Sequence, residues 1–179
     1  MNRVVLGLDI DGVLYPFHEA LYTYFQYEMN YVGTYQEFWL DYIPSMDLEK
    51  QKIVMSNPIP YDMILPSVQV MEFLSYAKDN SEIYYITHRP DELERITRRY
   101  FKRYDFPFQD NLIFTGDKVT ACRLYGITHF IDDFVNQVER VSAVADAYLM
   151  SRIHNRDYQD GLKIVHNLKE FKEIVFNVN

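Results

Sequence analysis

Apolar and polar positions follow two rhythms along this chain. Short apolar runs, rich in Val, Ile, Leu and aromatic residues, have the length and composition of buried strands. Between these runs, apolar residues recur every three or four positions, which is the period of one face of an α-helix. The runs that we predict as strands cover residues 4–8, 83–86, 112–114, 129–131, 147–150 and 163–165.

From residue 66 onward, strand and helix patterns alternate regularly. Because strands that alternate with helices pair in parallel through right-handed crossovers, the pattern predicts an α/β fold with a parallel sheet. In such sheets, ligands bind beyond the carboxyl ends of the strands. The predicted helices of this region cover residues 66–78, 91–104, 118–125 and 134–145, with a last one through Phe171 and Ile174.

Residues 15–64 separate the first strand from this regular alternation. Apolar and aromatic side chains recur at helical spacing over residues 17–30, 35–42 and 47–55, without a strand pattern. The Asn-Pro-Ile-Pro sequence at residues 57–60 ends this region. We therefore predict a small helical insertion between the first strand and the rest of the sheet.

Polar residues gather at the positions where the predicted strands end. The carboxyl ends of parallel strands meet at one edge of the sheet, so these side chains are expected to lie together. They comprise carboxylates, a hydroxyl and a lysine, a set that can hold a metal ion, supply a nucleophile and bind a phosphate. The residues are Asp9 and Asp11 after the first strand, Thr87, His88 and Arg89 at the second, Lys118 after the third, and Asp132 and Asp133 at the fourth.

The first of these groups has a spacing that matters for its chemistry. Asp9 and Asp11 stand one residue apart and precede Gly12. Residues i and i+2 of a strand share a face, and glycine lets the backbone turn, so both carboxylates can enter one pocket. Two carboxylates that close repel each other and need a cation, a shared proton or a strong donor. Mg2+ prefers oxygen ligands and is therefore our expected cofactor.

Each of these positions also has a purely structural explanation. The two aspartates after the first strand could form a solvated turn, and Thr87 could cap the helix that follows it. Lys118 could be an exposed lysine in a first helical turn, although that end of a helix disfavours cations. Asp132 and Asp133 could be helix caps. Since all of these explanations would have to hold independently at four strand ends, we favour a shared functional site.

Composition and charge narrow the classes of function. The 179 residues suit one domain with a small insertion, and an apolar fraction of 48% suffices for a core. A net charge of -8 argues against nonspecific binding to long nucleic acid. It leaves room for a small phosphorylated substrate that is held at a local cationic site.

The cysteine content and the hydropathy indicate the compartment. Cys122 is the single cysteine, so an internal disulfide and a cysteine-based zinc cluster are both excluded, which fits a reducing compartment. No apolar stretch approaches the roughly 20 residues of a membrane span. The start of the sequence runs into the first strand without the pattern of a cleavable signal. We expect a cytoplasmic protein without a membrane partner.

The residues at the strand ends resemble, in order, the four motifs of the haloacid-dehalogenase-like (HAD-like) phosphatase superfamily. The motifs appear here as residues 9–12, Thr87, Lys118 and residues 132–133, and the resemblance covers nearly the whole chain. The second aspartate of the first motif is typical of members that transfer phosphoryl groups, whereas the dehalogenases of this superfamily lack it.

The resemblance implies a three-layer, Rossmann-like parallel sheet with a small helical cap inserted after the first strand. Residues 1–14 and 65–179 would form the HAD-like catalytic core, and residues 15–64 would form the cap. Within the superfamily, the chain is most similar to the 5'(3')-deoxyribonucleotidase group. This finer similarity is carried by the short cap and by the sequences at residues 86–90, 130–133 and 154–156.

The resemblance also implies a mechanism in two steps. Asp9 would attack phosphorus and form an aspartyl-phosphate, and Asp11 would protonate the leaving oxygen and then activate water. Thr87 would bind a phosphoryl oxygen, and Lys118 would neutralise the phosphate and keep Asp9 ionised. Mg2+ would be held by Asp9, the main-chain carbonyl of Asp11 and Asp132, with Asp133 either bound directly or supporting the other ligands.

Further residues are candidates for contact with the substrate. His88 and Arg89 directly follow the second strand, and we include them in the substrate site. Aromatic rings at Phe17, His18 and Trp39 could stack a nucleobase, and we retain Phe17 and Trp39 as pocket residues. Three further features are expected to be structural: a solvated basic helix face at Arg95, Arg98, Arg99, Lys102 and Arg103, His129 in the core, and Asn155 as a support of the loop after the fifth strand.

We therefore predict a Mg2+-dependent phosphatase of nucleoside monophosphates, with deoxyribonucleotides as the leading substrates. One alternative keeps this chemistry for another small phosphate ester, such as a sugar phosphate, or for a nucleic-acid 3'-phosphate end. The other is a non-catalytic binding or scaffold protein, against which the mutually repelling carboxylates argue. The sequence leaves base preference, 5' versus 3' specificity and oligomeric state open.

Overall fold

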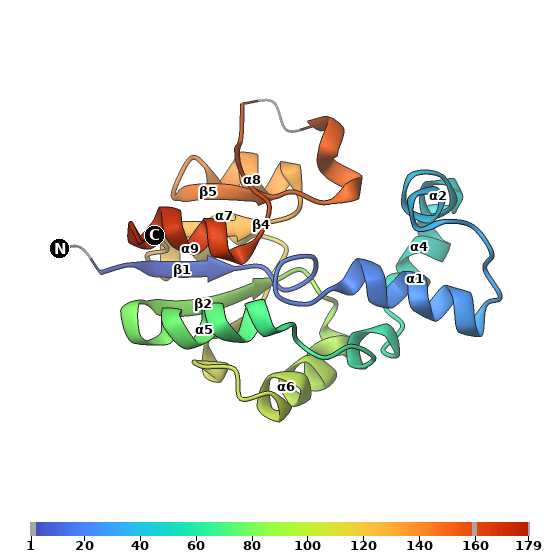
Figure 1. Ribbon diagram of the computed structural model, residues 1–179, viewed down its shortest axis with the longest axis horizontal. Helices are drawn as coiled ribbons and strands as arrows, with labels where there is room; N and C mark the ends of the chain where they lie inside the picture. The colour runs from blue at the N-terminus through green and yellow to red at the C-terminus, as the bar shows by residue number, and fades with distance from the viewer. Residues whose placement is uncertain (1–2, 159–160, 179) are drawn as a thin grey trace.

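A six-stranded parallel sheet forms the centre of the protein (Figure 1). The computed structural model describes residues 3–158 and 161–178. The order of the strands is β3-β2-β1-β4-β5-β6, and each strand pairs in parallel with its neighbours. The strands are β1 (Val5–Leu8), β2 (Glu82–Thr87), β3 (Leu112–Phe114), β4 (His129–Asp132), β5 (Asp146–Met150) and β6 (Lys163–Val165).

Helices cover both faces of this sheet, which makes three layers. Side chains along a strand alternate between the faces. On β2, Ile83 and Tyr85 belong to the buried cluster under α5, α6 and α9, whereas Ile86 belongs to the cluster under α7 and α8. The predicted Rossmann-like α/β fold is therefore confirmed. The helices are α5 (Val68–Asn80), α6 (Glu94–Arg103), α7 (Lys118–Leu124), α8 (Val135–Val141) and α9 (Leu168–Phe176).

The order of the strands reverses between β1 and β4. The chain passes outward from β1 to β2 and β3 and then returns to place β4 on the other side of β1. Leu8 pairs with Ile131, and the Asp9 main-chain N–H donates to the Ile131 carbonyl at 3.0 Å. Ligands of open α/β sheets bind at such a switch point, beyond the carboxyl ends of the strands. Asp9 and Asp132 lie on either side of it.

Residues 16–64 form a helical segment at the carboxyl ends of the strands (Figure 1). Within these residues, all of which the structure describes, no strand is present, as predicted. Packed aromatic rings such as Phe25 and Phe38, with centroids 5.1 Å apart, stabilise the segment. Its elements are α1 (Phe17–Glu28), α2 (Tyr35–Glu37), the π-helical turn η1 (Phe38–Tyr42), α3 (Ile43–Ser45), α4 (Leu48–Met55) and the 3-10 turn η2 (Pro60–Asp62).

Helix ends differ from the predicted ranges where local caps decide them. The helix predicted from residue 66 begins after Ser67, whose hydroxyl accepts a hydrogen bond from the Val70 N–H at 3.2 Å. The helix predicted over residues 134–145 ends at Val141. Short 3-10 turns are η3 (Asp91–Leu93), η4 (Gln109–Asn111) and η5 (Ile153–Tyr158). Among the described residues, no helix combines the length and the apolar character that crossing a membrane requires.

Candidate active site

Lys118 joins the ends of β1 and β4. It is the first residue of α7, yet its side chain is only 3% exposed, so an exposed first-turn lysine is ruled out. Its Nζ donates to Asp132 Oδ2 at 2.7 Å and to Asp9 Oδ1. Although burial lowers the pKa of Lys118, the two carboxylates raise it above its ordinary value. The ammonium is therefore charged and points at the end of β1.

Three buried carboxylates surround this ammonium. Oxygen atoms of Asp9, Asp132 and Asp133 all lie within 4.8 Å of one another. Burial, aided by the neighbouring carboxylates, raises the pKa of Asp9 to about 8 and that of Asp133 well above its usual range, although Lys118 opposes the shift. If all three carboxylates were ionised, the group would carry more negative charge than one ammonium balances, which is why these pKa values rise. A divalent cation with a preference for oxygen, such as Mg2+, fits these donors.

Gly12 makes room for one of these carboxylates. Its φ of +77° lies in the left-handed region, which favours glycine. A Cβ at this position would stand 1.9 Å from Asp133 Oδ2. Both the backbone conformation and the close approach of Asp133 therefore require the glycine.

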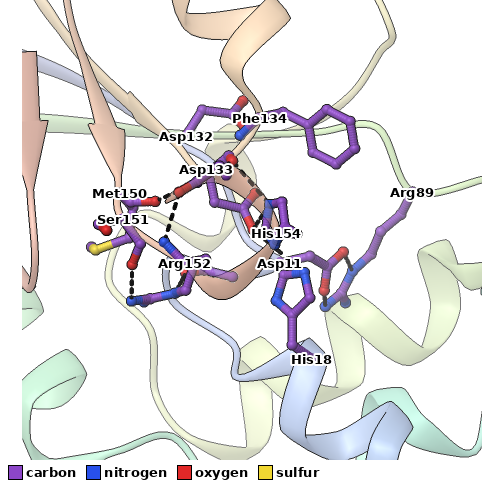
Figure 2. Close-up of polar contacts among 12 residues, drawn as sticks. Asp11, His18, Arg89, Asp132, Asp133, Phe134, Met150, Ser151, Arg152 and His154 are labelled. Atoms are coloured by element: carbon purple, nitrogen blue, oxygen red, sulfur yellow. Dashed lines mark hydrogen bonds and ion pairs between the residues drawn. The ribbon is translucent and has the colours of Figure 1, made fainter. Parts of the chain in front are cut away.

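Asp11 points to a different partner. Arg89 binds it in a bidentate pair, with Nε at 2.8 Å from Oδ2 and Nη2 at 2.6 Å from Oδ1 (Figure 2). Arg89 Nη1 also donates to Thr97 Oγ1 at 2.8 Å, and the Arg89 side chain is only 2% exposed. The sequence placed Arg89 in the substrate site. In the structure, the Arg89 guanidinium binds Asp11 and Thr97. It thereby balances the charge of the Asp11 carboxylate, which would otherwise face other acids.

Thr87 and His88 lie at the carboxyl end of β2. Thr87 is buried, and its Oγ1 accepts a hydrogen bond from the Arg89 N–H at 3.1 Å, so it orders the turn after the strand and does not cap a helix. His88 is exposed at the edge of the cavity. Both residues line the same cavity as the carboxylates.

His18 of α1 and His154 after β5 meet at Asp133, a contact that the sequence did not predict. The rings of His18 and His154 stack with centroids 4.6 Å apart, and both face Asp133 (Figure 2). Burial lowers the pKa of both histidines. Asn155 donates to the Asp133 carbonyl at 2.8 Å and to the Met150 carbonyl at 2.9 Å, so it supports this loop as expected.

The sequence offered a partial signal for this part of the site. The His-Asn-Arg sequence that begins at His154 is part of the resemblance to the 5'(3')-deoxyribonucleotidase group. Nothing in the sequence indicates that His18 contacts it. Arg152 was missed altogether. Its Nε donates a hydrogen bond to the Gly12 carbonyl at 2.7 Å. This bond holds the loop after β5 against residues 9–12.

A cavity of about 920 Å3 lies between the strand ends and the helical segment. Phe17 and Trp39 line it, although each is also packed in the core. Phe17 stacks on Tyr61 at 4.8 Å, and Trp39 meets the His18 ring edge-on at 4.5 Å. The size lies within the range of small-molecule sites. The strand ends line the cavity with the charged group, and the helical segment lines it with aromatic rings.

The basic residues of α6 and His129, which the sequence predicts to be structural, differ in how well they match that prediction. The basic face of α6 is exposed as expected, with Arg99 and Arg103 paired to Asp62 at 2.6 and 3.2 Å. His129 is half-buried rather than fully in the core, and its Nδ1 lies 2.9 Å from Thr128 Oγ1.

Comparison with known proteins gives a limited match in sequence. No family model matches the chain. A protein of Halalkalibacterium halodurans named "Putative nucleotidase BH1399" is 29% identical over 129 residues, which are 69% of this chain. The match spans 59% of the length of that relative.

Solved structures give a broader match in shape. A haloacid dehalogenase-like family protein, SP0104 of Streptococcus pneumoniae, has a TM-score of 0.66 at 11% identity, covering 96% of this chain and 98% of that one. The HAD-hydrolase YfnB of Bacillus subtilis, whose structure contains magnesium, has a TM-score of 0.67 at 10% identity, covering 99% and 100%. The L-2-haloacid dehalogenase PA0810 has a TM-score of 0.60 at 12% identity, covering 97% and 99%. The chain therefore has the fold of the haloacid-dehalogenase-like hydrolases.

Proposed function

We propose that this protein is a Mg2+-dependent phosphatase that hydrolyses nucleoside monophosphates, deoxyribonucleotides first among them, through an aspartyl-phosphate. The observation that carries the proposal is the buried contact of Lys118 with both Asp9 and Asp132, beside Asp133. A phosphoryl group needs positioned cations for the charge on its oxygens and a nucleophile in line with the leaving group. Lys118 supplies the first need and Asp9 the second.

In the first step, an oxygen of Asp9 forms a bond to phosphorus while the ester P–O bond breaks. The leaving alkoxide takes a proton from Asp11, and in the second step Asp11 removes a proton from the water that attacks phosphorus and restores Asp9. Mg2+, held by Asp9, Asp132 and Asp133, would screen the charge of the phosphate. Thr87 and Lys118 donate hydrogen bonds to the phosphoryl oxygens.

Asp11 must exchange a partner before it can act. Both of its oxygens accept hydrogen bonds from Arg89 in the structure. To act as the acid, Asp11 must therefore take up a proton from solvent, and one of these bonds must be replaced by the leaving oxygen of the substrate. A proton donor next to Asp9 suits an alkoxide, which needs a proton to leave, whereas a halide does not. This argument favours a phosphatase over a dehalogenase.

The aromatic lining of the cavity supports a nucleotide as the substrate. Phe17 and Trp39 of the helical segment line the same cavity as the charged group, and flat aromatic rings suit contact with a nucleobase. The name of the Halalkalibacterium halodurans relative agrees with this choice. His88, at the cavity edge, is placed to contact the phosphate or the sugar.

A screen of phosphate release tests the proposal. Deoxyribonucleoside monophosphates, ribonucleoside monophosphates, sugar phosphates and an oligonucleotide with a 3'-phosphate are each assayed with Mg2+ and with EDTA. We expect release from the deoxyribonucleotides with Mg2+ and none with EDTA. Release from sugar phosphates or 3'-ends alone would contradict the nucleotide assignment. No release from any substrate by a folded protein would overturn the phosphatase itself.

Two variants test the nucleophile within the same assay. Asp9→Asn should lower turnover by more than about 1,000-fold, because an amide oxygen cannot form the covalent intermediate. Asp41→Asn is the matched control, since Asp41 is exposed on the helical segment and should keep full activity. If Asp9→Asn kept its turnover, Asp9 would not be the nucleophile.

A further inference from the structure

Two histidines and an aspartate converge beside the group of three carboxylates. His18 comes from α1, His154 from η5, and Asp133 from the end of β4 (Figure 2). His18 Nε2 lies 3.7 Å and His154 Nε2 lies 3.5 Å from the same atom, Asp133 Oδ2. All three residues line the cavity.

Hydrogen bonding accounts for only part of this arrangement, because His154 Nε2 reaches the Asp133 main-chain carbonyl at 3.1 Å but neither histidine bonds to the Asp133 carboxylate. Both distances to Asp133 Oδ2 exceed the range of 2.7–3.2 Å that N–H···O bonds normally span. Asp133 Oδ2 is buried and has no hydrogen-bond partner among the described residues. A buried polar atom without a partner costs about 1–3 kcal/mol, so such an atom in a native site calls for an occupant.

These two distances to Asp133 Oδ2 fit ligands of one metal ion, and one ligand atom from each of the three residues lies within 4.8 Å of the other two. For bonds of about 2.0–2.1 Å, two ligand atoms in tetrahedral geometry stand about 3.4 Å apart. The observed separations of 3.5 and 3.7 Å are close to this value. Two imidazole nitrogens with one carboxylate oxygen suit Zn2+ and related transition metals, whereas Mg2+ prefers oxygen.

We propose that His18, His154 and Asp133 bind a transition-metal ion such as Zn2+ at a second site, with an open coordination position toward the cavity. Its two imidazole donors distinguish it from the oxygen site of Asp9, Asp132 and Asp133, with which it shares only Asp133, and the inference does not rest on the proposed phosphatase activity. Binding requires both imidazoles to carry their proton on Nδ1. The contact of 3.1 Å between His154 Nε2 and the Asp133 carbonyl is then given up.

Metal binding to the stripped protein tests the inference without any assay of activity. Excess Mg2+ fills the oxygen site, and Co2+ is then added to the wild-type protein as a spectroscopic probe for Zn2+. We expect one equivalent of Co2+ with the intense visible absorption of a four-coordinate ion, displaced by one equivalent of Zn2+. Weak absorption of a six-coordinate ion, or the absence of binding in the presence of Mg2+, would overturn the site.

Variants then assign the ligands by titration calorimetry with Zn2+, again in excess Mg2+. His18→Asn and His154→Asn should each weaken Zn2+ binding by at least about 100-fold, since loss of a direct ligand exceeds the 10–100-fold effect of losing a supporting residue. His166→Asn, at an exposed histidine, should bind Zn2+ as the wild type does. Unchanged binding by both ligand variants, with their fold verified by circular dichroism, would refute the assignment.

Discussion

A single absent Cβ lets the loop after β1 approach Asp133. Gly12→Ala would place a methyl group 1.9 Å from Asp133 Oδ2 and strain a φ of +77°. Gly126 has a φ of +63° and no neighbouring atom near the position of a Cβ. Gly126→Ala should therefore lose only the free energy of backbone strain, about 1–2 kcal/mol. We expect Gly12→Ala to lower the free energy of unfolding in urea by clearly more than this control. Equal losses would show that Asp133 does not depend on Gly12.

Arg89 makes three side-chain hydrogen bonds from a buried position. Arg89→Lys keeps the charge but loses the bidentate geometry toward Asp11, the bond to Thr97 and the stacking over the Tyr61 ring at 4.5 Å. We expect a loss of about 2–3 kcal/mol in the free energy of unfolding. Thr97→Val removes one of these bonds and should cost about 1 kcal/mol. A loss in Arg89→Lys no larger than in Thr97→Val would contradict the central role of the Asp11 pair.

At the scale of the element, α7 presents one buried face to the sheet. Lys118 and Cys122 stand four residues apart on this face, and Cys122 is only 1% exposed. Burial raises the pKa of the Cys122 thiol to about 12, so the reactive thiolate is scarce at pH 8. We expect Ellman's reagent to leave the native protein unlabelled at pH 8 and to label one thiol in guanidinium chloride. Rapid labelling of the native protein would show that α7 opens readily.

The sequence predicted the elements well where a periodic pattern alone decides them. The strands β3 and β6 match their predicted ranges, 112–114 and 163–165, because short apolar runs between turns have few alternative structures. Residues 35–42, predicted as an ordinary helix, contain the π-helical turn η1, which periodicity does not distinguish. Helix ends depended on caps such as Ser67.

The site was predictable in its location but not in its pairings. Strand order brings Asp9, Lys118 and Asp132 to one edge, and this follows from parallel topology. The pair of Asp11 and Arg89 joins residues 78 positions apart, and either residue could have faced the substrate instead. The stacking of His18 on His154 likewise depends on how the helical segment packs over the loop after β5, which carries no local signal.

At the scale of the whole molecule, a bound cation would link the ends of β1 and β4, which only the folded chain brings together. The carboxylates of Asp9, Asp132 and Asp133 repel one another in the native state and separate on unfolding, so Mg2+ should bind the native state alone. Ligand at 100 times its dissociation constant stabilises such a protein by about 2.7 kcal/mol. We expect saturating Mg2+ to raise Tm by about 5–10 °C, and EDTA to reverse the rise.

The decisive comparison is the size of this Mg2+-dependent rise and not Tm itself. Asp132→Asn relieves repulsion but also deprives Lys118 of a partner, so the Tm of the metal-free variant can shift in either direction. Its rise with Mg2+ should nevertheless fall to near zero, because a metal ligand is lost, whereas Asp41→Asn should keep the full rise. If Asp132→Asn retained the wild-type rise in differential scanning calorimetry, the cation would bind elsewhere, and the convergence of β1 and β4 would have to be explained by Lys118 alone.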